Sequence, residues 1–118
     1  MILWINGAFG AGKTTTARRL VEAIPGARLF DPEYVGFLLR EFVDVPTGDF
    51  QDLWLWRSLT VHTLAGLAAE HGDRWVVPMA LLNRTYRTEI FSGLRDRGLA
   101  VRQVALVVPE STLRARID

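Results

Sequence analysis

Apolar residues occur along the chain in two patterns, short continuous runs and longer stretches with helical spacing. The short runs predict buried strands of a parallel sheet, at residues 1–5, 27–30, 75–79 and 100–108. Apolar residues three and four positions apart predict helices at residues 13–24, 31–42, 53–70 and 86–97, with helix signals again from Pro109. This alternation predicts an α/β fold in which helices cover both faces of the sheet.

Several predicted boundaries carry a physical signal. Asp31-Pro32-Glu33 is a strong helix start, with Asp as the cap and Pro at the first helical position. Pro78 lacks an N–H group, so we expect it at the end of the third strand, where the ladder stops. Gly72 and Gly98 are expected to end helices. Because the strands run parallel, the segments that follow them converge on one edge of the sheet, where ligands bind.

The composition indicates one globular domain over residues 1–118, with a formal net charge of +1. Basic and acidic residues are interspersed, so no stripe is available for a nucleic-acid partner. No window is apolar enough for a transmembrane segment, and the amino terminus lacks the layout of a signal peptide. We therefore expect a cytoplasmic protein. The absence of cysteine excludes disulfides, thiolate metal sites and a cysteine nucleophile.

Between the first strand and the first helix, Gly7 to Thr14 show the spacing G-x-x-x-x-G-K-T of a phosphate-binding loop. Gly7 and Gly12 permit backbone angles that turn N–H groups toward an anion. Lys13 is expected to reach the β- and γ-phosphates of ATP, Thr14 to bind Mg²⁺ and Thr15 to bond the α-phosphate. The alternative is an ordinary glycine-rich turn with a lysine at a helix start. The predicted nucleotide site comprises Gly7, Ala8, Phe9, Gly10, Ala11, Gly12, Lys13, Thr14 and Thr15.

Beyond this loop, the chain resembles the tunicamycin-resistance protein family through most of its length. The matching blocks are Trp4 to Thr14, Phe30 to Glu33 with Gly36, Asp49 to Gln51 with Trp56-Arg57, and Val77 to Met79. The resemblance implies a P-loop NTPase of the kinase-like branch, with strand order 2-3-1-4-5, similar to shikimate, gluconate and nucleoside monophosphate kinases. It also implies ATP-dependent resistance to a lipid-bearing nucleoside antibiotic, which the family either phosphorylates or binds.

The chain departs from the usual P-loop pattern where a Walker B aspartate would follow an apolar strand. The third strand ends in Pro78-Met79 and the fourth in Pro109-Glu110. Asp31 is the better candidate for Mg²⁺ binding and catalysis, because shikimate-type kinases use an acidic residue at that corner. The alternative is that Asp31 only caps a helix. Glu33 is a candidate for substrate binding, or a favourable charge at a helix start.

Arginines are candidates because they clamp substrates and neutralise charge on a migrating phosphoryl group. By resemblance to small-molecule kinases, Arg114 and Arg116 begin a lid, Arg114 as a nucleotide contact and Arg116 as a catalytic residue. Arg40, Arg57 and Arg84 are expected on the substrate side, with a solvated surface position as the alternative.

Aromatic residues could form the wall of a pocket for a ring-bearing or apolar substrate, and a core position is equally compatible with them. They are Phe37, Phe50, Trp54 and Trp56, of which Trp56 is the candidate substrate contact. His62 and His71 have no partner at metal or triad spacing and are not expected to be catalytic.

The motifs favour a small-molecule kinase that uses ATP and Mg²⁺, with a nucleotide-dependent protein that sequesters an antibiotic as the alternative. A GTPase-like switch is disfavoured because the chain has neither Asn-Lys-x-Asp nor Asp-x-x-Gly. Kinases of this type continue after the fourth strand with a helix, a lid and a fifth strand. We therefore expect that the domain is incomplete at its carboxyl end, that the edge of the strand at 101–108 is unpaired, and that a longer chain is more active.

Overall fold

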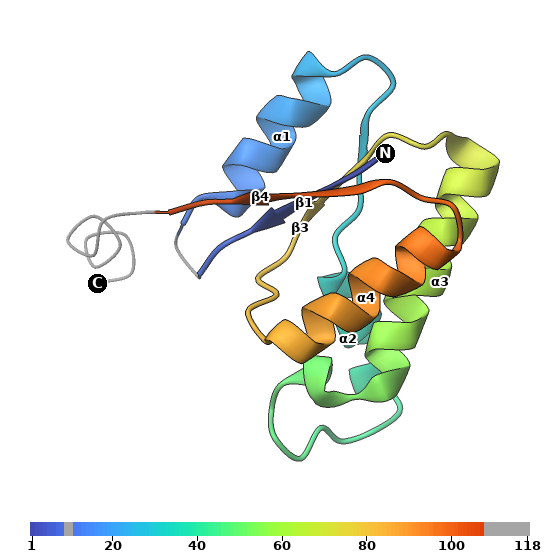
Figure 1. Cartoon of the computed structure of the whole chain (residues 1–118). Helices are drawn as coiled ribbons and strands as arrows, with labels where there is room; N and C mark the ends of the chain where they lie inside the picture. Colours follow the sequence, from blue (N-terminus) through green and yellow to red (C-terminus); the bar gives the residue numbers. More distant parts are fainter. Residues whose placement is uncertain (9–10, 108–118) are drawn as a thin grey trace.

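The computed structural model describes residues 1–8 and 11–107, in which four parallel strands alternate with helices (Figure 1). The strands are β1 (Ile2–Asn6), β2 (Arg28–Leu29), β3 (Trp75–Pro78) and β4 (Val101–Ala105). The helices are α1 (Lys13–Ala23), α2 (Glu33–Arg40), α3 (Trp54–His71) and α4 (Arg84–Asp96), with a 3-10 turn, η1 (Phe50–Asp52), before α3.

The strands form one sheet in the order β2-β3-β1-β4, and each neighbouring pair is parallel. This confirms the predicted α/β fold and the strand order 2-3-1-4. The ladder between β1 and β3 ends at the pair Ile5 and Pro78. Pro78 ends β3 as predicted, and one further bond of 3.2 Å runs from the Met79 N–H to the Ile5 carbonyl.

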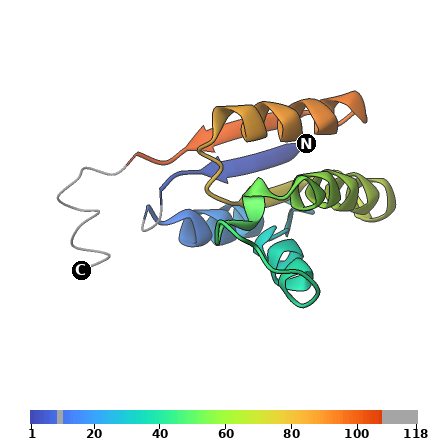
Figure 2. The same cartoon turned by 90° about the horizontal axis from the view of Figure 1, so that it is seen from below.

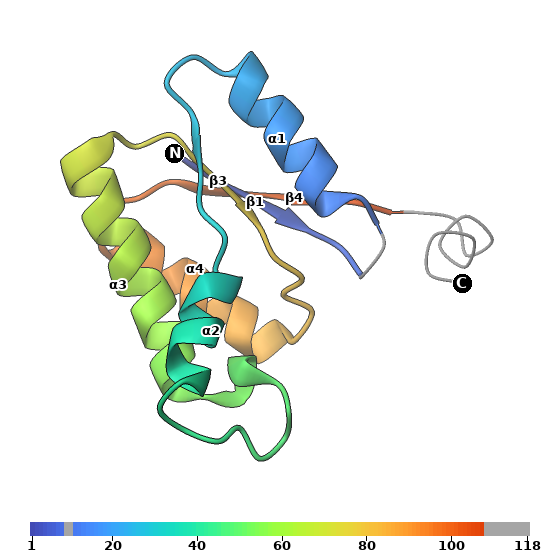
Figure 3. The same ribbon diagram turned by 180° about the vertical axis from the view of Figure 1, so that it is seen from behind.

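Helices cover both faces of the sheet, with α1 on one side and α3 and α4 on the other (Figures 1 and 3). Ile5 packs with Ala17 of α1, whereas Trp4 belongs to the larger core on the opposite side. The Trp4 ring meets Phe91 of α4 edge to face, with centroids 5.5 Å apart. Because successive residues of β1 are buried on opposite faces, the strand is apolar without interruption from Ile2 to Ile5.

Figure 2 shows α3 between α4 and α2, and α3 contacts both helices. Burial on two sides explains why apolar residues occupy a wide arc of α3. Trp56 and Leu64 have no exposed surface, whereas Trp54, at the first residue of the helix, is 64% exposed. The sequence pattern placed Trp54 on the apolar face with Trp56, but within the first turn of α3 only Trp56 points into the core.

Two predicted helix starts differ from the observed ones for local reasons. The helix expected from Tyr86 begins at Arg84, because the Asn83 side chain accepts a hydrogen bond from the Tyr86 N–H at 3.0 Å and so caps it. At α2 the cap position falls on Pro32, while Asp31 accepts from the Glu33 N–H. The helix signals from Pro109 lie outside the described residues. None of the helices in the described ranges is long and apolar enough to span a membrane.

Candidate functional site

The phosphate loop leaves the end of β1 and leads into α1 at the carboxyl edge of the sheet (Figure 1). Gly12, directly before α1, has a φ of 88°, a left-handed conformation that glycine adopts without strain. Gly7 lies against the end of β4, where an added Cβ would be 3.1 Å from the Leu106 carbonyl oxygen. Steric reasons therefore explain why both motif positions are glycine. Strand β1, the loop and α1 follow one another in the order that is typical of phosphate-binding sites.

The Lys13 side chain folds back over this loop, and its Nζ donates a hydrogen bond to the Ala8 carbonyl at 2.9 Å. Burial lowers the pKa of Lys13, and the negative charge of Glu33 opposes that shift. The charge of Glu33, at the start of α2, therefore acts on the lysine of the phosphate loop. Thr14 and Thr15 are exposed in the first turn of α1, where backbone N–H groups lack intrahelical partners. A phosphate bound there would meet these N–H groups and the Lys13 ammonium.

Two carboxylates stand at the start of α2, directly after β2. The Asp31 side chain accepts a hydrogen bond from the Glu33 N–H at 2.9 Å through one oxygen, Oδ1. Glu33 is exposed, and its charge acts on Lys13. Between them, the Pro32 carbonyl accepts a 3.1 Å bond from the Trp56 ring N–H, which ties α2 to α3. The start of α2 therefore carries two carboxylates, of which Glu33 acts on Lys13.

A cavity of about 300 Å³ opens beside the segment that follows β3. Its lining residues come from η1, from the β3–α4 connection and from the first turn of α4: Asp49, Gln51, Asp52, Ala80, Leu82, Asn83 and Tyr86. The Gln51 side-chain amide donates to the Ala80 carbonyl at 2.7 Å and so joins two of these segments. We call this the acceptor-side cavity, because it lies at the carboxyl end of the strand next to β1.

Hydrogen bonds hold the outer wall of the acceptor-side cavity. The hydroxyls of Thr47 and Tyr86 each donate to one oxygen of Asp52, both at 2.6 Å. These two bonds lower the pKa of the Asp52 carboxyl, and the bond from Thr47 has the larger effect. The bond to Asp52 raises the pKa of Tyr86. At neutral pH the wall therefore presents an ionised carboxylate and a protonated phenol.

A family model described as an AAA domain matches residues 2–118 of the chain. The structure of the tunicamycin resistance protein of Deinococcus radiodurans matches with a TM-score of 0.85 and 36% sequence identity, over 98% of this chain and 67% of that one. The chain belongs to the tunicamycin-resistance protein family. This confirms the resemblance found in the sequence blocks. No curated protein sequence matches the chain significantly.

The tunicamycin-resistance family shares its fold with small-molecule kinases. The APS kinase of Mycobacterium tuberculosis, in complex with AMPPNP and APS, matches with a TM-score of 0.72 and 22% identity, over 98% of this chain and 66% of that one. A sugar kinase from Janibacter sp. HTCC2649 matches with a TM-score of 0.68 and 20% identity, over 98% and 65%. The chain thus spans about two thirds of the length of these structures.

Within this family fold, two of the predicted substrate-side arginines brace the wall instead of opening into it. Arg57 donates to the Gln51 carbonyl at 2.7 Å, forms an ion pair with Glu89, and lies 4.3 Å from the centre of the Tyr86 ring. Arg40 donates to the Gly48 carbonyl at 2.9 Å.

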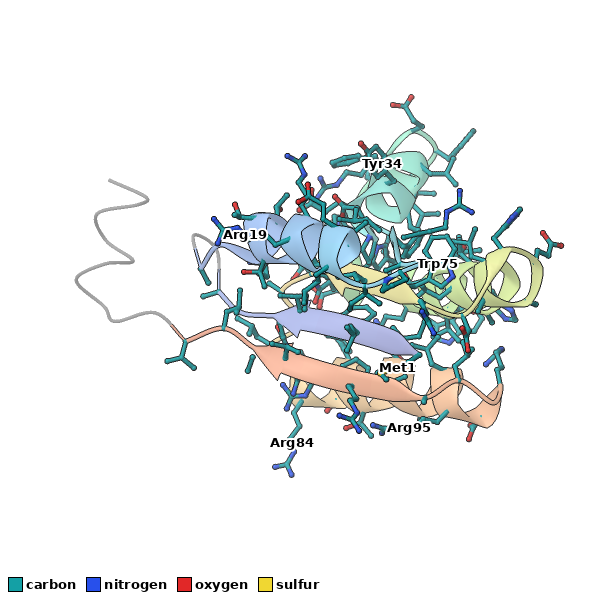
Figure 4. All side chains as sticks on the ribbon, turned by 90° about the horizontal axis from the view of Figure 1, so that it is seen from above. Met1, Arg19, Tyr34, Trp75, Arg84 and Arg95 are labelled. Carbon is teal, nitrogen blue, oxygen red and sulfur yellow. The ribbon has the colours of Figure 1, made fainter. Side chains whose placement is uncertain are left out.

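The other predicted substrate residues lie apart from one another. Arg84 is exposed and projects from the start of α4 (Figure 4). Trp56 is fully buried, so in this conformation it supports α2 from the core and presents no surface to a substrate. The predicted substrate-side residues thus differ in burial, and the charge of Glu33 acts on Lys13.

Four of the predicted nucleotide and catalytic residues lie outside the described ranges, namely Phe9, Gly10, Arg114 and Arg116. The two histidines have local neighbours. His62 lies 3.3 Å from an Arg97 nitrogen, and His71 is 3.8 Å from Glu70. Within residues 1–8 and 11–107, no three His, Asp or Glu side chains form a cluster that could hold a metal ion.

Sequence reasoning missed several residues that shape the site. Asp52 and Tyr86 are far apart in the sequence, so no local pattern signals their bond. Asn83 could have been found, because asparagine ahead of a helical stretch is a cap signal. Asn6, which precedes the first motif glycine, entered the sequence analysis only as part of the block from Trp4 to Thr14.

Proposed function

We propose that this chain binds ATP at the phosphate loop and transfers the γ-phosphoryl group to a hydroxyl of a small molecule of the tunicamycin type. The observation that carries this proposal is the Lys13 ammonium folded over the loop between β1 and α1, next to the left-handed Gly12. The name of the Deinococcus radiodurans relative and the AMPPNP complex of the APS kinase support it. Because ATP is the donor, we also propose a cytoplasmic location.

The nucleotide side of the site uses backbone and side-chain donors. Lys13 leaves the Ala8 carbonyl and pairs with the β- and γ-phosphates, and the N–H groups of the first turn of α1 surround the remaining oxygens. Thr15, exposed in that turn, bonds the α-phosphate. The lid arginines Arg114 and Arg116 would cover the phosphates.

Mg²⁺, when bound with ATP, neutralises charge on the phosphates. The Thr14 hydroxyl and the Asp31 carboxylate would hold it, since oxygen donors suit this ion. One hydroxyl and one carboxylate are sufficient protein ligands, because Mg²⁺ takes its other ligands from phosphate and water.

On the acceptor side, a substrate hydroxyl approaches from the cavity beside β3. Its oxygen forms a bond to the γ-phosphorus while the bond to the β–γ bridging oxygen breaks, and ADP leaves. Glu33 accepts the proton of the hydroxyl. The carboxylates of Asp49 and Asp52 favour a substrate that brings hydrogen-bond donors. The wall is held by Arg40 and Arg57 through their bonds to backbone carbonyls. The exposed Arg84 reaches the substrate from the rim.

Sequestration of an antibiotic without transfer is the second candidate function. The observation that favours it is the absence of a carboxylate in the segment from Trp75 to Asn83, where a Walker B acid is usual. A protein of this kind would bind ATP and the antibiotic together and release both unchanged.

Mass spectrometry of the antibiotic separates the two functions. Wild-type protein is incubated with ATP, Mg²⁺ and tunicamycin, with Lys13→Ala as the matched control. Phosphoryl transfer predicts that tunicamycin gains one phosphoryl group as ADP appears, and that the control gives neither product. Recovery of unmodified tunicamycin in a stable complex with the protein and ATP would overturn transfer and establish sequestration.

A further inference from the structure

Asn6, the last residue of β1, carries a buried amide that is only 4% exposed. Its oxygen accepts hydrogen bonds from the Gly7 N–H at 2.9 Å and the Leu81 N–H at 2.8 Å. Its nitrogen donates to the Leu81 carbonyl and to the Gln103 side-chain oxygen, both at 2.8 Å. All four hydrogen-bonding positions of the amide are therefore in use.

The three partners of Asn6 belong to different parts of the site. Gly7 opens the phosphate loop. Leu81 is fully buried in the β3–α4 connection, and its neighbours Ala80 and Leu82 line the acceptor-side cavity. Gln103 lies in β4 on the other side of β1. One side chain thus joins the nucleotide side of the edge to the acceptor side.

The Asn6 amide takes over where the backbone ladder stops. The pairing of β1 with β3 ends at Pro78, and the last backbone bond between them is donated by Met79. The side-chain amide of Asn6 then bonds to both the N–H and the carbonyl of Leu81. Because the ladder bond of Met79 is the last one, the two bonds between Asn6 and Leu81 hold the following part of the β3–α4 connection against β1.

We infer that Asn6 is a positioning residue that fixes the phosphate loop relative to the β3–α4 connection. The inference rests on the proposed function, because it assigns Asn6 to the same edge of the sheet. Asn6 acts through Gly7 and Leu81 and touches neither nucleotide nor acceptor itself. Fixed spacing matters in a transfer site, where a misplacement of about 1 Å costs roughly 100-fold in rate.

Two substitutions test this role through nucleotide affinity. Asn6→Asp keeps the shape but removes both N–H donors and sets a carboxylate against the Leu81 carbonyl and the Gln103 oxygen. Asn6→Ser is smaller and keeps one hydroxyl, which guards against a variant that does not fold. We expect each to weaken binding of AMP-PNP by about tenfold or more, measured by calorimetry below the unfolding temperature.

Hydrogen exchange gives a second readout that does not depend on nucleotide. In both variants, backbone amides of residues 79–83 should exchange faster, whereas those in the middle of α4 should not change. Leu64→Ala is the control, because Leu64 is a fully buried core residue of α3. It should lower the unfolding temperature and leave AMP-PNP affinity at the wild-type value.

The outcomes are distinguishable. If both Asn6 variants lose stability as Leu64→Ala does but bind AMP-PNP with wild-type affinity, the positioning role is wrong and the proposed function stands. If wild-type protein does not bind AMP-PNP, the proposed function is wrong and this inference is overturned with it.

Discussion

The two sides of the candidate site are built in different ways. The phosphate loop is one continuous segment, and its geometry follows from Gly7, Gly12 and the start of α1. The acceptor-side cavity is assembled from η1, the β3–α4 connection and the first turn of α4. Side-chain bonds such as Gln51 to Ala80 and Tyr86 to Asp52 hold those parts together. The described ends of the phosphate loop adjoin a strand and a helix, whereas the acceptor-side cavity depends on individual side-chain contacts.

We infer from this difference which part of the site tolerates substitutions. We expect a substitution in the phosphate loop to remove nucleotide binding, and we expect the wall of the acceptor-side cavity to accept new residues as long as its bracing hydrogen bonds remain. The wall is therefore where we expect substrate choice to be decided. Variants on each side allow the two to be compared, and they are given in decreasing order of expected effect on binding or stability.

Loss of the Lys13 charge should have the largest effect. Lys13→Ala removes a charged hydrogen bond of about 1.5–3 kcal/mol, which corresponds to roughly 10- to 150-fold weaker ATP binding. Stability should change little, because within residues 1–8 and 11–107 the Lys13 Nζ bonds to one loop carbonyl, that of Ala8. Calorimetric titration with ATP measures the effect. Arg19→Ala, an exposed charge loss in the same helix, should bind as wild type does, and equal affinity for both variants would contradict the assignment of Lys13.

The contact between α2 and η1 should be sensitive to one added methyl group. A Cβ at Gly36 would overlap the Phe50 ring, which packs against the buried Trp56 with centroids 5.2 Å apart. We expect Gly36→Ala to destabilise the fold by about 1–3 kcal/mol in urea unfolding.

Gly66→Ala is the matched control, because nothing lies within 4 Å of the added Cβ in the interior of α3. It should stabilise the protein by about 0.5–1 kcal/mol through helix propensity. Equal stability changes in the two variants would show that α2 does not pack on η1 as described.

The two carboxylates at the start of α2 should affect Lys13 differently. Glu33→Gln should lower the pKa of Lys13 further, because the Glu33 charge raises it. Asp31→Asn should leave that pKa nearly unchanged, keep the helix start, and weaken Mg²⁺-dependent activity, since asparagine caps about as well as aspartate. Titration of the Lys13 side chain by NMR compares the two variants. A larger shift in Asp31→Asn would exchange the roles of the two residues.

The bond between Tyr86 and Asp52 should show its effect through pH. Asp52 has a pKa below its ordinary 3.8, so its stabilising contribution is present above that value and lost as pH falls through the lower pKa of the folded state. Tyr86→Phe should therefore lower the unfolding temperature slightly near neutral pH, and the difference from wild type should shrink on acidification. A difference that is independent of pH would mean that Asp52 gains nothing from Tyr86.

The sequence was sufficient for the fold because its signals are local. Continuous apolar runs identified the four strands, and Pro78 and Gly72 marked real ends. The phosphate loop was visible for the same reason. The braces of Arg57, Tyr86 and Asp52 were not predictable, because they join residues whose spacing in the chain carries no pattern. Nor could the apolar pattern separate the buried Trp56 from the exposed Trp54, since both belong to one helix and only tertiary packing distinguishes them.

The central claim is that nucleotide binds at the loop between β1 and α1. Mapping backbone amide shifts by NMR during a titration with Mg²⁺ and AMP-PNP tests that claim most directly. We predict large shifts at Gly12, Lys13, Thr14 and Thr15, with smaller ones at Glu33 and little change in the middle of α3. Saturable shifts that avoid the start of α1, or that gather at the opposite edge of the sheet around Ile24 and Trp75, would contradict it.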